Sequence, residues 1–261
     1  MTLAVTRTGR GRPSYVFLHG LLGQGKNWAT IAKALEPAAS LVVDLPDHGR
    51  SSWSERVSYG SMAAEVAHLI DVSGTEPITL VGHSMGGKVA MRVALDHRDR
   101  VARLVVVDIA PAASAVKEFR TYVDAMDAID LDRLGSRGDA DAQLVSVAPD
   151  SRTRGFLLQS LHREASGWRW APNLAGLRAG LDEIGSWNPG PALPYPGPVL
   201  WIAGAESPYI RPEHMDPMRV LFPRVRLVTV KEAGHWVHAD RPAVVADVIR
   251  QFVALTPLDP A

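Results

Sequence analysis

Short apolar runs alternate with amphipathic segments along most of the chain. The runs consist mainly of Val, Ile and Leu and lie at residues 15–18, 41–44, 78–81, 104–107, 198–203 and 225–230. Parallel strands that are buried on both faces have this composition. Residues 61–72 and 85–97 have helical spacing instead, and one face of the first segment would carry Met62, Val66, Leu69 and Ile70. The alternation predicts an α/β fold with a mostly parallel, doubly wound sheet, helices on both faces, and function at the carboxyl ends of the strands.

The alternation stops between residues 112 and 190. Helices are expected at 115–130 and 150–163, and this stretch contains no convincing strand. The chain would return to the sheet between Pro189 and Pro198. We therefore predict a core made of residues 1–111 and 191–261, with a helical lid of residues 112–190 inserted after the run at 104–107.

The composition narrows the class of protein. The 261 residues, 46% of them hydrophobic, can bury the large core of a single α/β domain. The 28 basic residues equal the 28 acidic ones, which argues against nucleic acid or an anionic membrane as a partner held by bulk charge. No cysteine is present, so disulfides are impossible. Neither a signal-peptide-like stretch at the N-terminus nor a run near the ~18 residues of a membrane span is found, and a cytoplasmic location is expected.

A serine lies in a glycine-flanked turn directly after a predicted strand. The sequence Gly82-His83-Ser84-Met85-Gly86 follows the apolar run at 78–81 and matches G-x-S-x-G, the nucleophile elbow. Only small residues fit two positions before and after the serine in so tight a turn, which leaves its hydroxyl exposed at the tip of the strand. A helix would begin near Met85, so that an oxyanion bound beside Ser84 would lie at the positive end of a helix dipole.

The serine needs a base, because a free hydroxyl is a weak nucleophile near neutral pH. His235 lies between a glycine and a tryptophan, after the run at 225–230 and before a C-terminal helix. This late position fits the chain order serine, acid, histidine of hydrolases with a nucleophile elbow. His238 follows three residues later and raises the alternative of a metal-binding pair, but no third ligand cluster supports a metal.

The loop after the first apolar run fits an oxyanion hole. Its sequence is Phe17-Leu18-His19-Gly20-Leu21-Leu22-Gly23. The two backbone donors are expected to be the N–H groups of Leu21 and of Met85, the residue that follows the nucleophile. His19 is expected to brace the loop by hydrogen bonding.

The acid that would orient the histidine has two candidates. Asp108 follows the run at 104–107, and a carboxylate at the end of so apolar a run needs partners, of which a histidine ring would be one. Glu206 follows the run at 198–203, but it comes one place before Ser207, the position at which an aspartate is often found. We favour Asp108 and keep Glu206 as the alternative.

With these residues in place, the whole chain resembles the α/β-hydrolase superfamily. Five segments are similar to those of the small YbfF-type bacterial esterases and their mitochondrial abhydrolase relatives: residues 44–51, 82–88, 107–111, 207–209 and 233–239. The resemblance implies the α/β-hydrolase fold with a helical lid after the sixth strand of that fold. It also implies that Asp108 is the acid, as in the bacterial members.

The function expected on these grounds is that of a serine hydrolase. It would cleave carboxylic esters or thioesters of an apolar acyl group through an acyl-enzyme, with no cofactor and no metal. Leu22, Tyr209, Trp236 and Trp170 are expected at the substrate pocket. The same elbow also serves carbon–carbon bond hydrolases, cofactor-free haloperoxidases and elimination catalysts of menaquinone synthesis, and some proteins of this fold are small-ligand receptors, so these remain alternatives.

Overall fold

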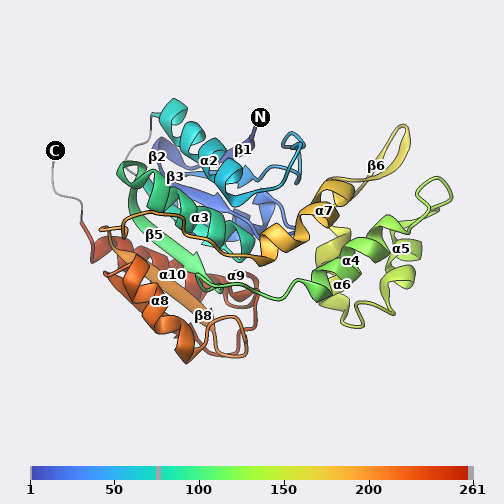
Figure 1. The fold of residues 1–261 in the computed structure, drawn as a ribbon. Helices are drawn as coiled ribbons and strands as arrows, with labels where there is room; N and C mark the ends of the chain where they lie inside the picture. The colour runs from blue at the N-terminus through green and yellow to red at the C-terminus, as the bar shows by residue number, and fades with distance from the viewer. Residues whose placement is uncertain (1, 75–77, 258–261) are drawn as a thin grey trace.

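The computed structural model describes residues 2–74 and 78–257 of the chain (Figure 1). Within these residues, seven strands form one sheet in the order β1-β3-β2-β4-β5-β8-β9. Their bounds are Ala4–Thr8 (β1), Arg10–Leu18 (β2), Ala38–Asp44 (β3), Ile78–His83 (β4), Val101–Val107 (β5), Val199–Gly204 (β8) and Val225–Val230 (β9). All neighbouring strands pair in parallel except β1, which pairs antiparallel with β3. The predicted mostly parallel sheet is confirmed.

Helices cover both faces of this sheet, as predicted. One face packs against α2 (Tyr59–Ser73), α3 (Met85–Asp96) and α8 (Met215–Leu221), and the other against α1 (Ala29–Ala34) and α10 (Pro242–Ala254). On β5, Leu104 and Val106 point to the first face whereas Val105 and Val107 point to the second. Because successive side chains alternate between two buried faces, the strand is apolar throughout and gives the continuous run seen in the sequence.

The register of the central strands brings their carboxyl ends to one edge. His83 on β4 lies opposite Val107 on β5, and Val107 lies opposite Ile202 on β8. The residues that follow β4 and β5 therefore emerge side by side. This edge is where an open parallel sheet carries its function.

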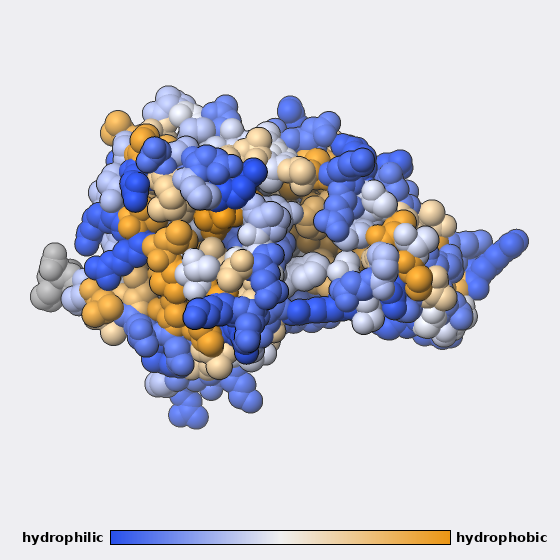
Figure 2. Space-filling model, turned by 90° about the horizontal axis from the view of Figure 1, so that it is seen from below, coloured by the Kyte–Doolittle hydropathy of each residue, from blue (hydrophilic) through white to orange (hydrophobic). Residues whose placement is uncertain are grey.

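The segment between β5 and β8 does not join the main sheet. It contains α4 (Lys117–Asp127), α5 (Arg137–Leu144), α6 (Ser151–Leu158) and α7 (Leu174–Gly185), and it lies at one end of the molecule (Figure 1). Seen from below, apolar side chains gather over the body that holds the sheet, whereas the outer end of the inserted segment is hydrophilic (Figure 2).

Two expectations about strands are wrong. The inserted segment contains a hairpin, β6 (Leu161–Glu164) and β7 (Gly167–Trp170), where only helix was expected, and α6 ends at Leu158 instead of near residue 163. Strands of four residues with alternating polar side chains produce no apolar run, which explains why they were missed. Strand β1 was not predicted either, since its sequence AVTRT is half polar and lies at the edge of the sheet.

Hydrogen bonds tie the inserted segment to the core at both ends. Lys88 is buried on α3, and its Nζ donates to the Ser114 hydroxyl at 3.1 Å and to the Ser186 carbonyl at 2.8 Å, on the two chain connections of the insertion. Burial lowers the pKa of Lys88 to about 8. Asp47 accepts a bond of 2.8 Å from the side-chain amide of Asn173, at the start of α7. None of the described helices is long and apolar enough to cross a bilayer.

Candidate active site

Ser84 occupies a strained turn between β4 and α3. Its backbone has φ 52° and ψ −121°, a conformation that non-glycine residues rarely adopt and that costs about 1–3 kcal/mol. Glycine is required around it: a Cβ on Gly82 would lie 2.2 Å from the Gly86 carbonyl oxygen, and one on Gly86 would lie 2.4 Å from the His19 carbonyl oxygen. The structure thus contains the sharp elbow that the sequence predicts.

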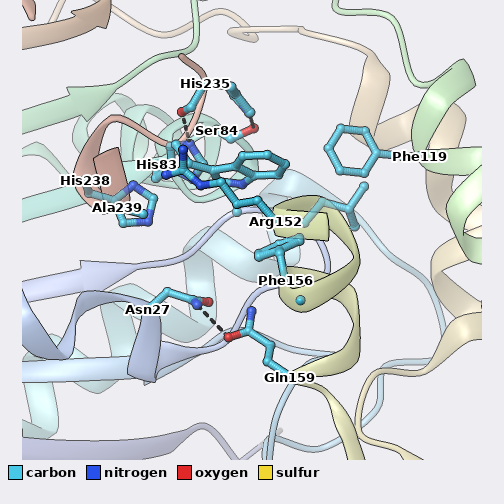
Figure 3. Close-up of a pocket in the computed structure, with 14 residues that line it drawn as sticks. Asn27, His83, Ser84, Phe119, Arg152, Phe156, Gln159, His235, His238 and Ala239 are labelled. Carbon is cyan, nitrogen blue, oxygen red and sulfur yellow. Dashed lines mark hydrogen bonds between the residues drawn. The ribbon is translucent and has the colours of Figure 1, made fainter. Parts of the chain in front are cut away.

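The side chains of Ser84, His235 and Asp108 form a continuous hydrogen-bonded chain. Ser84 Oγ lies 3.0 Å from His235 Nε2, and His235 Nδ1 lies 2.7 Å from Asp108 Oδ2. Because a carboxylate only accepts, Nδ1 carries the ring proton, which leaves Nε2 free to accept the proton of the serine hydroxyl. The ring and the hydroxyl lie next to each other at one end of the site in Figure 3.

Asp108 is fully buried after β5, where its own backbone has a positive φ of 52°. Besides His235, its carboxylate accepts a bond of 3.0 Å from the Gly204 N–H and one from the Ser207 hydroxyl. Ser207 was not anticipated as a partner, although the sequence placed it where an acid often stands. Of the two candidate acids, Asp108 is the one hydrogen-bonded to His235, whereas the side chain of Glu206 is exposed to solvent.

Two further histidines surround the base and are neutral. His83 Nε2 donates to the backbone carbonyl of His235 at 2.8 Å, and the His238 ring stacks on Trp28 with centroids 4.5 Å apart. Burial lowers the pKa of His238 to about 3 and holds the pKa of His83 well below its ordinary value. Both rings are therefore uncharged and do not compete with the base for a proton near neutral pH.

The loop after β2 is braced by two buried histidines. His19 Nδ1 donates to the Gly20 carbonyl at 2.8 Å, and its Nε2 accepts from the Leu45 N–H at 2.9 Å. His48 Nε2 accepts from the Leu22 N–H at 3.1 Å. Burial lowers the pKa of His19 to about 3 and also lowers the pKa of His48, so both rings stay neutral and keep an acceptor nitrogen.

The same loop comes close to the elbow. A Cβ on Gly20 would lie 2.9 Å from a ring nitrogen of His83 and 3.3 Å from Ser84 Cβ, so glycine permits the approach. Leu21 borders two cavities beside Ser84, and Met85 borders the smaller of them. The residues expected to supply the oxyanion donors are thus brought to the nucleophile.

The larger cavity beside Ser84 and His235 has a volume of about 250 Å³. Phe119, Phe156 and Trp236 supply its aromatic wall. The rings of Phe156 and Trp236 are 5.2 Å apart, so residues of the insertion and of the core meet here. A smaller recess of about 20 Å³ also reaches Ser84 and Phe119.

The four residues expected at the substrate pocket divide into two pairs. Trp236 lines the larger cavity, and Tyr209 lines the smaller one with its ring stacked 4.1 Å from that of His235. Leu22 and Trp170 line neither cavity. Leu22 is fully buried within the loop after β2. Trp170 packs inside the insertion, where its indole N–H donates to the Met126 carbonyl at 3.0 Å.

Known proteins are similar to this chain over nearly its whole length. The family described as "alpha/beta hydrolase fold" matches residues 13–242. The mouse protein named sn-1-specific diacylglycerol lipase ABHD11 is 39% identical over 250 residues, which cover 93% of this chain and 81% of the relative. Esterase YbfF of Escherichia coli (strain K12) is 31% identical over 239 residues, 91% of this chain and 92% of the relative. A solved structure titled "Marine microorganism esterase" superposes with a TM-score of 0.93 at 32% identity, covering 96% of this chain and 99% of that one.

Proposed function

The chain belongs to the α/β-hydrolase family, and from this premise we propose that it hydrolyses carboxylic esters with Ser84 as nucleophile, His235 as base and Asp108 as the acid that orients the base. The observation that carries the proposal is the hydrogen-bonded chain from Ser84 Oγ through His235 to Asp108, next to an aromatic cavity. The names of the relatives, esterase and lipase, agree with this reaction.

The reaction begins when His235 Nε2 takes the proton of Ser84 as Oγ attacks the ester carbonyl carbon. Asp108 holds the proton on Nδ1 and stabilises the imidazolium that forms. The oxyanion of the tetrahedral intermediate accepts hydrogen bonds from the N–H groups of Leu21 and Met85. His235 then donates its proton to the leaving alcohol, and an acyl group remains on Ser84.

Water completes the cycle by the same route. His235 removes a proton from the water as it attacks the acyl-enzyme. The second tetrahedral intermediate then collapses, and His235 returns this proton to Ser84 Oγ as the acid is released. Apart from the ester and the water, every group in this cycle belongs to the chain itself. A thiol can leave in place of an alcohol, so thioesters are included among the proposed substrates.

The acyl group is proposed to be apolar and to occupy the aromatic cavity. Phe119 and Phe156 come from α4 and α6, so residues of the insertion supply part of the cavity wall. We therefore propose that residues 112–190 act as a lid over the core of residues 1–111 and 191–261. A lid of this kind excludes water from the acyl-enzyme and sets the shape of the acyl site.

A panel of p-nitrophenyl esters and acyl-CoA thioesters of increasing chain length tests the proposal. Wild-type protein is expected to hydrolyse apolar acyl esters, and Ser84→Ala is expected to lose at least about three orders of magnitude in kcat/KM with an unchanged melting temperature. Ser166→Ala, which changes an exposed serine in the turn between β6 and β7, serves as the matched control. Full activity in purified Ser84→Ala would refute the assignment.

A further inference from the structure

One end of the larger cavity is polar. Asn27, on η1 (Gly25–Trp28), and Gln159, which directly follows α6, both line it. Figure 3 shows these two amides at the opposite end of the site from Ser84 and His235, with Phe156 between. The proposed hydrolysis uses neither of them, so their arrangement calls for its own explanation.

The orientation of both amides is fixed by a backbone donor. The Gln24 N–H donates to Asn27 Oδ1 at 2.7 Å, so the Asn27 nitrogen must be on the other side of its amide. That nitrogen donates to Gln159 Oε1 at 2.9 Å. These two hydrogen bonds fix the orientation of the Gln159 amide. Its Oε1 faces Asn27, so its Nε2 is the atom that faces away from Asn27.

That atom is a donor without an acceptor. Gln159 Nε2 is buried and has no hydrogen-bond partner within the described residues. In Figure 3 it points away from Asn27, toward Phe156. Buried donors are nearly always satisfied in folded proteins, so an unpartnered donor on a residue that lines a cavity calls for an acceptor.

Gln159 is also held rigidly. Its backbone carbonyl accepts bonds of 3.1 Å from the side chains of both Gln24 and Lys26. The side chain therefore extends from an anchored point, and its direction is set by Asn27. Little conformational entropy remains to be lost when a ligand accepts its hydrogen bond.

The surroundings favour an uncharged acceptor. Burial holds the pKa of both His83 and His238 low, so the nearby rings are neutral. Arg152 lines the cavity but forms an ion pair with Asp240. A carboxylate would lose its hydration among aromatic rings and find no unpaired cation among these cavity residues, whereas an ether, hydroxyl or ester oxygen would gain a bond at little cost.

We propose that Gln159 is a specificity-determining residue whose side-chain N–H donates to an uncharged oxygen acceptor carried by the substrate at a distance from the scissile ester. The substrate class is then an ester with a second oxygen function, an ether, a hydroxyl or another ester, in its apolar arm. This inference rests on the proposed ester hydrolysis.

The test uses p-nitrophenyl esters of straight-chain acids in which one methylene, at successive positions, is replaced by an ether oxygen. Each ether has a methylene counterpart of the same length and shape. For at least one position, wild-type kcat/KM is expected to be about tenfold higher for the ether, the effect of one hydrogen bond between uncharged groups. Gln159→Met, which keeps the length of the side chain without the amide, is expected to lose the preference, so that its kcat/KM for each ether equals that for the methylene counterpart.

A second variant tests orientation without changing Gln159. Asn27→Asp still accepts from the Gln24 N–H but offers Gln159 an acceptor instead of a donor, so the Gln159 amide is expected to flip and turn its oxygen to the cavity. The ether preference should disappear in Asn27→Asp as well. Gln251→Met, an exposed glutamine on α10, is the matched control and should keep the preference.

The outcomes separate the two proposals. A wild-type protein that hydrolyses the methylene esters but shows no ether preference at any position, or a Gln159→Met variant that keeps the preference, overturns the role of Gln159 and leaves ester hydrolysis standing. Equal losses on ether and methylene esters in Gln159→Met indicate a purely structural residue and also overturn the role. A wild-type protein that hydrolyses none of the esters refutes the proposed function, and the inference with it.

Discussion

Replacing Asp108 with asparagine should nearly abolish turnover while leaving the fold in place. The carboxylate accepts from three donors: His235 Nδ1–H at 2.7 Å, the Gly204 N–H at 3.0 Å, and the Ser207 hydroxyl. An asparagine offers one oxygen and one NH₂ group. If its oxygen faces Gly204, its NH₂ faces His235 and forces the proton onto Nε2, the nitrogen that must accept the serine proton.

The opposite amide orientation does not rescue the variant. It restores an acceptor for His235 but places NH₂ against the Gly204 N–H, which leaves two buried donors facing each other. The first orientation is therefore preferred, and the wrong tautomer lowers kcat by about three to four orders of magnitude. This corresponds to about 4–5.5 kcal/mol of transition-state stabilisation, at about 1.4 kcal/mol for each factor of ten.

The assay is steady-state hydrolysis of a short p-nitrophenyl ester, with the melting temperature of each variant measured alongside. Glu206→Gln is the matched control, because this exposed carboxylate lies close in sequence to Ser207 but does not contact the base. Its kcat should stay within about twofold of wild type, as expected for a surface substitution. An Asp108→Asn variant that keeps more than about a tenth of wild-type activity, or a larger loss in Glu206→Gln, would refute this reasoning.

Three other predictions follow from burial and packing. Burial lowers the folded-state pKa of His19 and His238 to about 3, so on acidification the unfolded chain binds protons that the folded chain does not. The two histidines together should lower the free energy of unfolding by about 4 kcal/mol between pH 7 and pH 5, as measured by urea titration. An unchanged free energy of unfolding at pH 5 would contradict this. Gly82→Ala should lower the free energy of unfolding by about 3 kcal/mol or prevent folding, because its Cβ would lie 2.2 Å from a carbonyl oxygen. Gly60→Ala, whose Cβ would have nothing within 4 Å, should leave the stability unchanged or raise it. Equal melting temperatures for the two variants would refute the close packing. Phe119 lines both cavities at Ser84, so Phe119→Ala should join them. The preferred acyl chain in the ester panel should then be longer. An unchanged chain-length profile would count against the proposed acyl site.

The parts of the site that local geometry dictates were visible in the sequence. Ser84 was predicted because its turn admits only glycine at Gly82 and Gly86, which gives the recognisable pattern G-x-S-x-G. His235 was predicted because it follows a strand and precedes a helix late in the chain, and the structure places its Nε2 3.0 Å from Ser84 Oγ. The sheet was predictable for a similar reason, since strands buried on both faces must be apolar throughout.

The parts that depend on long-range placement were not visible. The choice between Asp108 and Glu206 depends on how the turns after β5 and β8 aim their side chains, and the positive φ of Asp108 has no sequence signature. The pairing of Asn27 with Gln159 joins positions 132 residues apart. Trp170 was expected at the pocket, but its indole packs inside the insertion. The hairpin that carries Trp170 is too short and too polar to be predicted from the sequence.

The proposed hydrolysis depends on the reactivity of a single hydroxyl, which mass spectrometry of the protein after treatment with a fluorophosphonate tests most directly. The proposed hydrolysis predicts one covalent adduct per chain, which is located on Ser84, forms slowly in His235→Ala and is absent in Ser84→Ala. A protein that hydrolyses esters while its adduct lies on another residue, or that never forms one, would contradict it.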